Sequence, residues 1–169
     1  MVNEDIILRL MISDDYTLFE SLYCDDKVMM YVAPPLKKDD ARESFARAML
    51  YNSEPSARRR FFVIQPKRLN CSVGIAGFNV FELNRKVEVG IMLLEEYQMC
   101  NLGSKALTQL IFSINEDYCD FEVIANLDVR NLPALRLVSR LGFDYLYDGS
   151  FKLDKTKFYN SVDNLVIGY

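Results

Sequence analysis

The sequence of 169 residues contains no histidine. Without an imidazole the chain can form neither a Ser-His-Asp or Cys-His catalytic site nor a metal site with histidine ligands. If the protein uses a general base, that base has to be a carboxylate, a lysine, a tyrosine or a cysteine.

Cysteine is scarce, and long apolar runs are missing. The four cysteines, Cys24, Cys71, Cys100 and Cys119, show no CxxC or other metal-ligand spacing. This favours free thiols in a reducing compartment over a disulfide framework. The opening segment MVNEDIILRL carries acids where a secretory signal carries bases. No stretch approaches the roughly 20 apolar residues of a membrane span. We therefore expect a cytoplasmic protein with no bound metal and no membrane partner.

Basic residues are outnumbered by acidic ones. Lys plus Arg is 20 and Asp plus Glu is 24, which gives a net charge of −4 and a pI near 4.9. A general nucleic-acid binder needs a basic surface for the phosphates, so this balance argues against nucleic acid as a partner. It favours a cationic substrate. The length suits a single domain, residues 1–169, rather than two domains.

Hydrophobic periodicity and turn residues predict strands and helices in a definite order. We expect a strand at Ile6–Met11, a helix starting at Ser13, a helix capped by Asp39 or Asp40 and running to Tyr51, strands at Phe61–Gln65, Cys71–Phe81 and Val87–Leu94, a helix at Gly103–Asp117, a strand at Phe121–Asn126, a helix at Pro133–Leu141 ended by Gly142, and two or three strands from Phe143 to Tyr169. The short turns predict an antiparallel meander. The helical connection predicts parallel pairing of Val87–Leu94 with Phe121–Asn126.

The most informative stretch joins the strand at Val87–Leu94 to the helix that begins near Gly103. A tight loop that opens a helix presents backbone N–H groups and the positive end of the helix to an anion. Gly103 permits close approach to the backbone, Ser104 adds a hydroxyl and Lys105 a positive charge. The alternative is an ordinary strand–turn–helix unit whose glycine serves only the turn.

Two motifs resemble those of a known family, the GNAT N-acetyltransferases. The segment from Tyr97 to Ser104, YQMCNLGS, is similar to their acyl-CoA loop: Gln or Arg, two variable residues, Gly, one variable residue, then Gly or Ala. The segment from Asn131 to Phe143, NLPALRLVSRLGF, resembles their second block. The lead-in from Glu88 to Ile91 and the closing segment from Val162 to Val166 are similar to the branch that modifies ribosomal-protein N-termini, where the closing segment is the last strand.

This resemblance implies an α+β fold with a mixed, mostly antiparallel central sheet, flanked by helices and splayed between its fourth and fifth strands. It implies that acetyl-CoA, the co-substrate, lies in that cleft. The backbone at Met92, Leu93 and Leu94 would pair with the pantetheine, and Asn131 would reach the same arm. The loop would cradle the diphosphate with Gln98, Met99, Cys100, Asn101, Leu102, Gly103 and Ser104.

The chain departs from the family pattern at three positions. Asn101 stands in place of the first glycine of the loop. Asparagine tolerates left-handed backbone better than other non-glycine residues, but its side chain either crowds the phosphates or adds a donor to them. Ala134 replaces a frequent serine, and Val138 replaces a frequent tyrosine that acts as general acid. No proton donor for the leaving thiolate is evident, although a thiol with a pKa of about 8.5 leaves without help.

Glu88 is the best candidate for the group that accepts the proton of the attacking amine, directly or through water. Strand alternation places it on the same face as Gly90 and Met92. The alternative is a solvent-exposed strand carboxylate with no part in catalysis. Weaker candidates, each with a more common structural role, are a phenol from Tyr145 or Tyr147, a reactive thiol at Cys100, and phosphate contacts from Arg58, Arg59 and Arg60.

These features predict direct transfer of an acetyl group from acetyl-CoA to a primary amine, which is a protein N-terminus, a lysine or a small amine. The alternative is a CoA-binding or protein-interaction module that has kept the fold and lost turnover, which Asn101, Ala134 and Val138 favour. The sequence leaves open whether the protein is a monomer or a homodimer.

Overall fold

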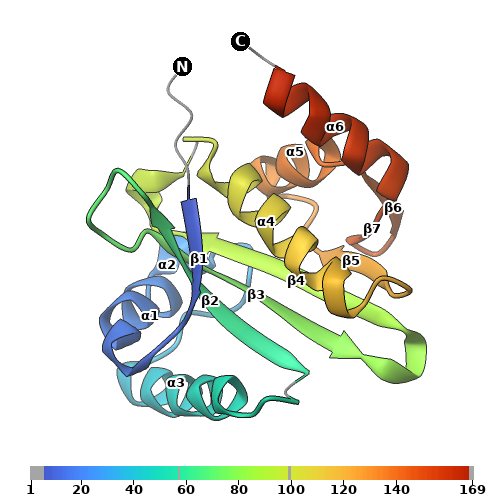
Figure 1. The fold of residues 1–169 in the computed structure, drawn as a ribbon. Coiled ribbons are helices and arrows are strands. Elements are labelled where there is room, and N and C mark those ends of the chain that lie inside the picture. Colours follow the sequence, from blue (N-terminus) through green and yellow to red (C-terminus); the bar gives the residue numbers. More distant parts are fainter. Residues whose placement is uncertain (1–5, 57, 99, 168–169) are drawn as a thin grey trace.

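A seven-stranded sheet forms the centre of the molecule (Figure 1). The computed structural model describes residues 6–56, 58–98 and 100–167, and the side chains among them as far as residue 162. The elements are β1 (Ile6–Leu10), α1 (Tyr16–Tyr23), α2 (Asp26–Met29), α3 (Lys38–Ser53), β2 (Arg59–Pro66), β3 (Gly74–Phe81), β4 (Lys86–Leu93), α4 (Leu102–Asp117), β5 (Glu122–Asn126), α5 (Leu132–Arg140), β6 (Phe143–Tyr147), β7 (Ser150–Leu153) and α6 (Lys155–Ile167), with 3₁₀ turns at Ser13–Asp15, Glu82–Asn84 and Glu95–Tyr97.

The strand order is β1-β2-β3-β4-β5-β7-β6, and every neighbouring pair is antiparallel except β4 and β5. This confirms the predicted α+β class, the antiparallel meander and the parallel pair. The β3–β4 ladder runs the length of both strands, from Gly74–Leu93 to Phe81–Lys86. The β4–β5 ladder, in contrast, holds only from Lys86–Glu122 to Glu88–Ile124. Beyond Glu88 the two strands part, which is the predicted splay.

Helices cover both faces of the sheet. In Figure 1, α1 and α3 lie on one side and α4 on the other. The apolar stripe predicted for α4 is buried as expected, in the cluster that also contains Val87 and Val89 of β4. A second cluster joins α1 and α3 to the opposite face through Phe19, Phe45 and Val63.

The C-terminal segment differs from the prediction. Residues 143–153 include the expected strands β6 and β7, but residues 162–166, expected to form a strand, belong to helix α6. Asp154 precedes this helix, and its Oδ1 accepts a hydrogen bond from the N–H of Lys157 at 3.1 Å. Phe158 is fully buried, and Val162, one turn later, packs against the same cluster. The apolar residues therefore repeat with the period of a helix, which the prediction of a strand overlooked.

Helix α3 begins earlier than predicted. Its N-cap is Lys37, whose side chain caps nothing, so neither Asp39 nor Asp40 is the cap. Both aspartates lie in the first turn, where a carboxylate interacts favourably with the positive end of the helix. The two aspartates therefore predicted correctly that a helix starts in this region, but they predicted the wrong N-cap residue. Strand β3 likewise begins at Gly74 rather than at Cys71.

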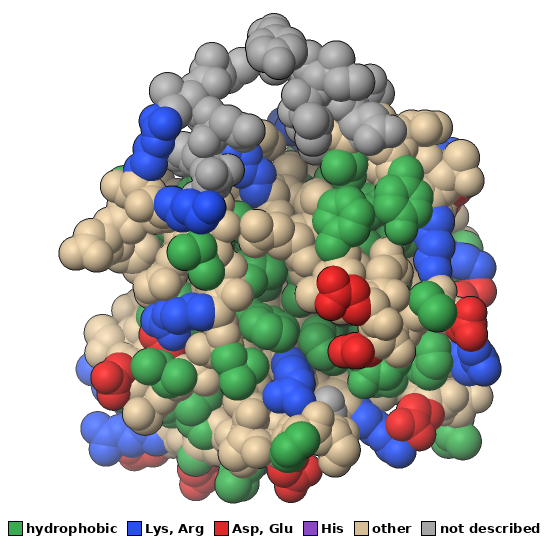
Figure 2. Space-filling model, viewed as in Figure 1, with side chains coloured by type: hydrophobic (Ala, Val, Ile, Leu, Met, Phe, Trp, Pro, Cys, Tyr) green, Lys and Arg blue, Asp and Glu red, His purple; other side chains and the backbone are tan. Residues whose placement is uncertain are grey.

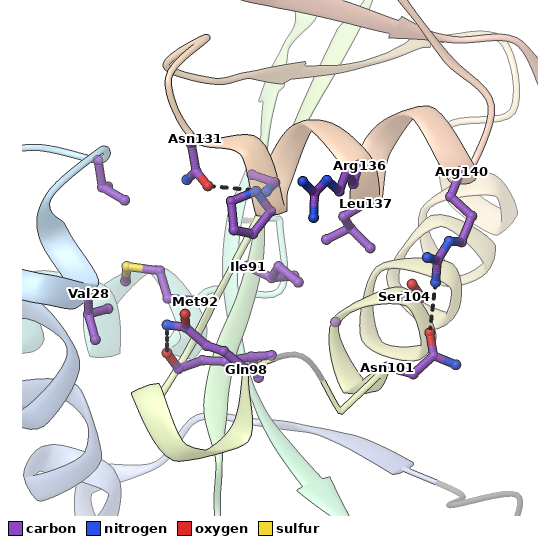
Figure 3. Close-up of a pocket in the computed structure, with 15 residues that line it drawn as sticks. Val28, Ile91, Met92, Gln98, Asn101, Ser104, Asn131, Arg136, Leu137 and Arg140 are labelled. Atoms are coloured by element: carbon purple, nitrogen blue, oxygen red, sulfur yellow. Dashed lines mark hydrogen bonds between the residues drawn. The ribbon is translucent and has the colours of Figure 1, made fainter. Parts of the chain in front are cut away.

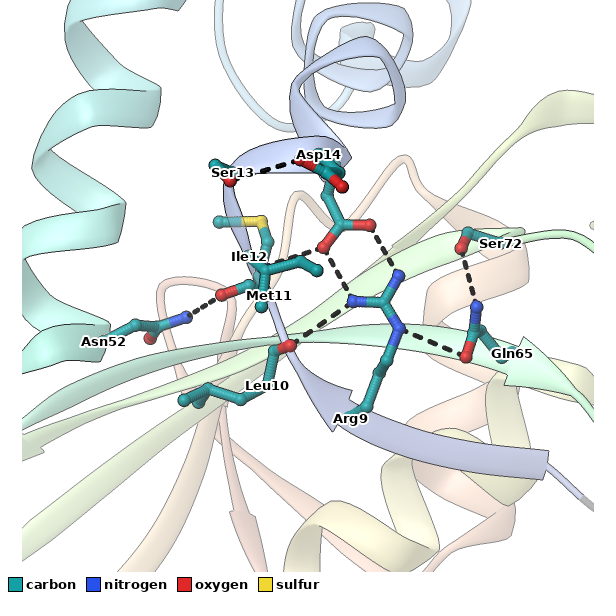
Figure 4. A network of polar contacts seen from close by, with 10 residues as sticks. Arg9, Leu10, Met11, Ile12, Ser13, Asp14, Asn52, Gln65 and Ser72 are labelled. Atoms are coloured by element: carbon teal, nitrogen blue, oxygen red, sulfur yellow. Dashed lines mark hydrogen bonds and ion pairs between the residues drawn. The ribbon is translucent and has the colours of Figure 1, made fainter.

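Arg9 and Asp15 tie β1 to the turn that leads into α1 (Figure 4). The two terminal nitrogens of Arg9 donate to the Asp15 carboxylate at 2.7 and 2.6 Å, and its Nε donates to Gln65 on β2 at 3.2 Å. Asp15 is 6% exposed, and its Oδ2 also accepts the N–H of Ile12 at 2.8 Å. Burial by itself raises the pKa of Asp15, but the bonds from Arg9 and Ile12 outweigh it and hold the pKa below its ordinary value.

We expect Asp15→Asn to lower the free energy of unfolding by about 2 kcal/mol at neutral pH, because Arg9 is left partly buried without a counter-charge. The pKa of Asp15 is lower in the folded state than in the unfolded chain, where it is about 3.9. The carboxylate therefore stabilises the fold above that pH and ceases to do so as the pH falls through the folded-state pKa. Urea unfolding should show the difference between variant and wild type shrinking below about pH 4. An equal difference at neutral and acidic pH would contradict this account.

Basic and acidic side chains are both spread among apolar ones on the face shown in Figure 2. Among the helices that the structure describes, none combines the length and the apolar character required to cross a membrane.

Candidate functional site

A pocket of about 340 Å³ lies beside the part of β4 that has separated from β5 (Figure 3). Its walls come from β4, the loop into α4, the first turn of α4, one face of α5 and the segment around α2. The lining residues are Val28, Val32, Ile91, Met92, Leu93, Gln98, Asn101, Gly103, Ser104, Asn131, Pro133, Ala134, Arg136, Leu137 and Arg140.

The edge of β4 beside this pocket turns main-chain groups away from the sheet. The N–H of Leu94 donates to the carbonyl of Val73 at 3.0 Å. In an antiparallel ladder this fixes the alternation, so Ile91 and Leu93 direct their N–H and C=O groups toward the opening. The carbonyl of Leu93 accepts a hydrogen bond from Nε2 of Gln98 at 3.1 Å. The N–H groups of Ile91 and Leu93 are therefore positioned to bind an extended ligand as a neighbouring strand would.

The loop between β4 and α4 ends in a left-handed residue. Asn101 has φ 60° and ψ 4°, and its side chain makes no capping hydrogen bond. The turn therefore survives with asparagine in place of the missing glycine, in line with the tolerance of this residue type for left-handed backbone. The N–H groups of Leu102, Gly103 and Ser104 follow in the first turn, where helical N–H groups lack partners within the helix. Together with the macrodipole of α4, they make this end of the pocket attractive to an anion.

Gly103 also serves the packing of the pocket floor. A Cβ at this position would lie 3.1 Å from Cδ1 of Ile91 and 3.5 Å from Cδ2 of Leu137. The absence of a side chain therefore lets α4 approach both β4 and α5 closely.

Helix α5 contributes polar and basic side chains. Asn131 is its N-cap, with Oδ1 accepting the N–H of Ala134 at 3.1 Å, which leaves its side-chain NH₂ as a donor. Arg136 and Arg140, one turn apart, line the pocket as well. None of the described lining residues is acidic. The pocket is therefore a basic region in a chain of net charge −4.

Helix α2 lies on the opposite side of the pocket from α4 (Figure 3), where Val28 and Val32 add apolar surface. Asp25 begins α2 by accepting the N–H groups of Lys27 and Val28 at 2.8 and 2.9 Å. Lys27 also pairs with Glu95, in the turn after β4, at 3.0 Å, and this bond raises the pKa of Lys27. The capping signal of Asp25 was present in the sequence, but α2 was not predicted from it.

The loop between β5 and α5 approaches the segment that follows α2. The guanidinium carbon of Arg130 lies 5.9 Å from the ring centroid of Tyr31. Arg130 also donates to Asp128 from Nη2 at 2.6 Å, and its hydrogen bonds lower the pKa of Asp128 to about 2. The α2 segment therefore contacts both of the loops that flank the pocket.

Glu88 lies at the point where β4 and β5 part. It is opposite Ile124 in the last β4–β5 pair, and its Oε1 accepts a hydrogen bond from Nδ2 of Asn126 at 2.8 Å. Its neighbours Val87 and Val89 are buried in the cluster beneath α4. The side chain of Glu88 therefore points to the other face of the sheet, as strand alternation predicts. It is half-buried and does not line the pocket.

Most of the residues predicted to bind the cofactor are brought together in this pocket: Met92, Leu93, Gln98, Asn101, Gly103, Ser104 and Asn131. Three others do not line it. Leu94 bonds to Val73 through its N–H, Leu102 is 1% exposed in the core, and Cys100 is exposed to solvent. Met99 lies outside the described residues.

Ala134 and Val138, two of the residues that depart from the family pattern, lie in different environments. Ala134 lines the pocket, whereas Val138 is 2% exposed and packs in the core beneath α5. The weaker candidates lie elsewhere: Tyr145 and Tyr147 are exposed on β6, and Arg58 pairs with Glu82 at 2.6 Å.

Several lining residues were not predicted from the sequence: Val28, Val32, Ile91, Pro133, Arg136, Leu137 and Arg140. The two arginines carried a usable signal, since a spacing of four on an amphipathic helix places both on one face. Val28 and Val32 gave no such signal in the sequence, because only tertiary packing brings them close to β4.

Comparison with known proteins agrees with this geometry. A sequence profile described as an acetyltransferase (GNAT) domain matches residues 5–144. A search of curated protein sequences gave no significant match.

Solved structures share the fold at low sequence identity. Spermidine N-acetyltransferase from Vibrio cholerae, in complex with CoA and spermine, is 16% identical with a TM-score of 0.72, covering 92% of this chain and 98% of that one. RimL, a ribosomal L7/L12 alpha-N-protein acetyltransferase in complex with coenzyme A, is 15% identical with a TM-score of 0.72, covering 89% and 94%. A GNAT-family acetyltransferase from Bacillus anthracis is 15% identical with a TM-score of 0.71, covering 89% and 93%.

Proposed function

Because the chain belongs to the GNAT acetyltransferase family, we propose that it transfers the acetyl group of acetyl-CoA to a primary amine. One observation carries the proposal: β4 parts from β5 after Glu88 and leaves an open strand edge beside a basic pocket. An extended ligand that ends in phosphates matches this arrangement.

The residues present fit the two chemically different parts of CoA. The N–H of Leu93 suits an amide carbonyl of the pantetheine arm, and the NH₂ of Asn131 adds a donor from the other wall. The first turn of α4 and the arginines of α5 suit the phosphates. When bound, acetyl-CoA supplies an activated thioester that an amine can attack.

In this proposal Glu88 takes the proton of the attacking amine, directly or through a water molecule. The hydrogen bond from Asn126 to Oε1 holds the carboxylate in place and leaves Oε2 to accept that proton. The N–H of Ile91, which is nearer to Glu88 in the chain than that of Leu93, donates to the thioester oxygen as negative charge develops there. Holding both reactants in the cleft lowers the entropic part of the barrier.

The proposal includes no general acid. Ala134 offers only a methyl group to the pocket, and the buried Val138 replaces the family's frequent tyrosine. The leaving group therefore departs as a thiolate, which a thiol pKa of about 8.5 allows.

The acceptor in this proposal is a protein N-terminus, a lysine or a small amine. Its place is the face of the sheet that carries Glu88, where a Cβ built on Gly90 meets nothing within 4 Å. The net charge of −4 favours a cationic acceptor. We place the reaction in the cytoplasm, in line with the four free cysteines.

A second candidate function is a CoA-binding or interaction module without turnover. The features that favour it are Ala134 and Val138, since the two replace a serine and a tyrosine that are frequent in the family.

Thiol release separates these two functions. Acetyl-CoA is incubated with the protein and a pool of amines comprising peptides with free N-termini, lysine peptides and polyamines, and free CoA is measured. The transferase releases thiol with at least one amine. Binding of CoA that raises the Tm without any release supports the module, because a ligand that binds only the folded state stabilises it by mass action. If millimolar ligand causes no thiol release and no Tm shift, both functions are rejected.

A further inference from the structure

Helix α5 turns two arginines to the pocket, and the family motifs assign a role to neither. Arg136 and Arg140 lie one turn apart on the same face of the helix, and both line the pocket. Within the part of the chain that the structure describes, no carboxylate forms an ion pair with either guanidinium. Two unpaired cations on a wall free of acids indicate an anionic ligand.

Asn101 presents a specific difficulty for such a ligand. It has φ 60° and stands at the position of the first glycine in the family loop. Its side-chain amide carries an acceptor oxygen as well as two donors. An acceptor oxygen that faces a phosphate is repulsive, so a free asparagine here would weaken the binding that a glycine allows.

Arg140 removes this difficulty. Its Nη1 donates to Oδ1 of Asn101 at 3.5 Å (Figure 3), so the acceptor oxygen of the asparagine faces the guanidinium. The NH₂ of Asn101 and the remaining N–H groups of Arg140 are donors. The pair therefore directs the acceptor oxygen toward a cation and offers hydrogen-bond donors and one positive charge at the start of α4.

We propose that Arg140 and Asn101 act as a linked pair that, together with Arg136, binds the phosphate groups of CoA and replaces the contact made possible by the missing glycine. This inference rests on the proposed function. Arg140 contacts phosphate through its remaining N–H groups and orients Asn101 as a second donor. Pantetheine, which lacks the phosphates, gains nothing from the pair.

If the two residues act as a pair, the effect of Asn101→Gly on CoA affinity depends on whether Arg140 is present. Arg140→Ala removes a charge-assisted contact and leaves the Asn101 oxygen free to face the anion, so CoA affinity should fall about 10- to 100-fold. Asn101→Gly alone should change affinity less than about fivefold, because it restores the glycine loop. Combined with Arg140→Ala, however, Asn101→Gly should recover part of the lost affinity. Residues that act independently would give additive effects instead.

Isothermal titration calorimetry with CoA and with pantetheine tests the link in the wild type, the two single variants, the double variant and Arg136→Ala. Arg136→Ala should also weaken CoA binding, but Asn101→Gly should not rescue it. Arg47→Ala is the matched control, since Arg47 is exposed on α3 and bonds to Ser44. The Tm of each variant without ligand checks folding. If Arg140→Ala fails to fold, Arg140→Lys, which keeps the charge but loses the planar fork, should show an intermediate loss.

Weaker CoA binding in Arg140→Ala, unchanged pantetheine binding and partial rescue by Asn101→Gly are the expected results. Wild-type CoA affinity in Arg140→Ala, or no rescue in the double variant, would overturn the inference while leaving the proposed function intact. Failure of the wild type itself to bind CoA would reject the proposed function, and the linked pair with it.

Discussion

Glu88→Gln is expected to lower kcat by about 100- to 10,000-fold, the range that a positioned general base contributes. Glutamine keeps the size of the side chain and the oxygen that accepts from Asn126 at 2.8 Å in the wild type, so the fold and its Tm should not change. It cannot, however, take a proton from the amine. Steady-state kinetics with a responsive acceptor measure the effect, and the KM for acetyl-CoA should stay the same because Glu88 does not line the pocket.

The pH dependence distinguishes this role from a general loss of activity. An amine is mostly protonated below its own pKa, so the need for a base is greatest there. The ratio of wild-type to variant rates should fall as the pH rises toward the pKa of the acceptor. Glu122→Gln is the matched control, because Glu122 is a carboxylate on the adjacent strand that pairs with Lys152. Wild-type rates for Glu88→Gln at every pH would make Glu88 an ordinary strand carboxylate.

Gly103→Val should raise the Kd for CoA more than 100-fold, a loss of about 2.8 kcal/mol or more of binding free energy at 1.4 kcal/mol per factor of ten. The first added carbon would already lie 3.1 Å from Ile91 and 3.5 Å from Leu137, and the valine methyls would extend into the pocket. They would also cover the main chain at the start of α4, where the anion is expected to bind. The measurement is the disappearance of the Tm shift caused by CoA.

Two further variants make this result interpretable. Gly103→Ala adds only the first carbon and should cause a smaller loss of affinity. Ala46→Val places the same valine on the exposed side of α3 and should leave the Tm shift unchanged. Unchanged CoA affinity in Gly103→Val would mean that the phosphates bind elsewhere.

Much of the fold was predictable because its strands and helices obey simple periods. The stripe of α4 repeats every three to four residues and is buried as expected. The short turns from β2 to β4 fixed the antiparallel order, and the helical connection fixed the parallel pair. The prediction was wrong for residues 162–166, where Phe158 and Val162 form a short helical pattern in α6 that resembles a strand when only its last residues are considered.

The site was predictable on one wall and not on the other. The loop from Gln98 to Ser104 could be predicted from local sequence, since a turn and the start of a helix depend on neighbouring residues. The remaining wall depends on contacts between distant segments. Val28 lies on the short helix that Asp25 begins, and Lys27 of the same helix pairs with Glu95 after β4.

The sequence by itself determined the order of the strands and of helices α1, α3, α4 and α5, the tolerance of Asn101 for a left-handed turn and the lack of any imidazole, because each is a property of composition, of local periodicity or of one residue's backbone freedom. Only the tertiary structure decided that Arg140 meets Asn101 across 39 residues of chain. The physical reason is the early end of the β4–β5 ladder. The gap that it opens brings the start of α4 and the face of α5 that carries Arg136 and Arg140 to one pocket, and no spacing in the sequence records how far two strands stay paired.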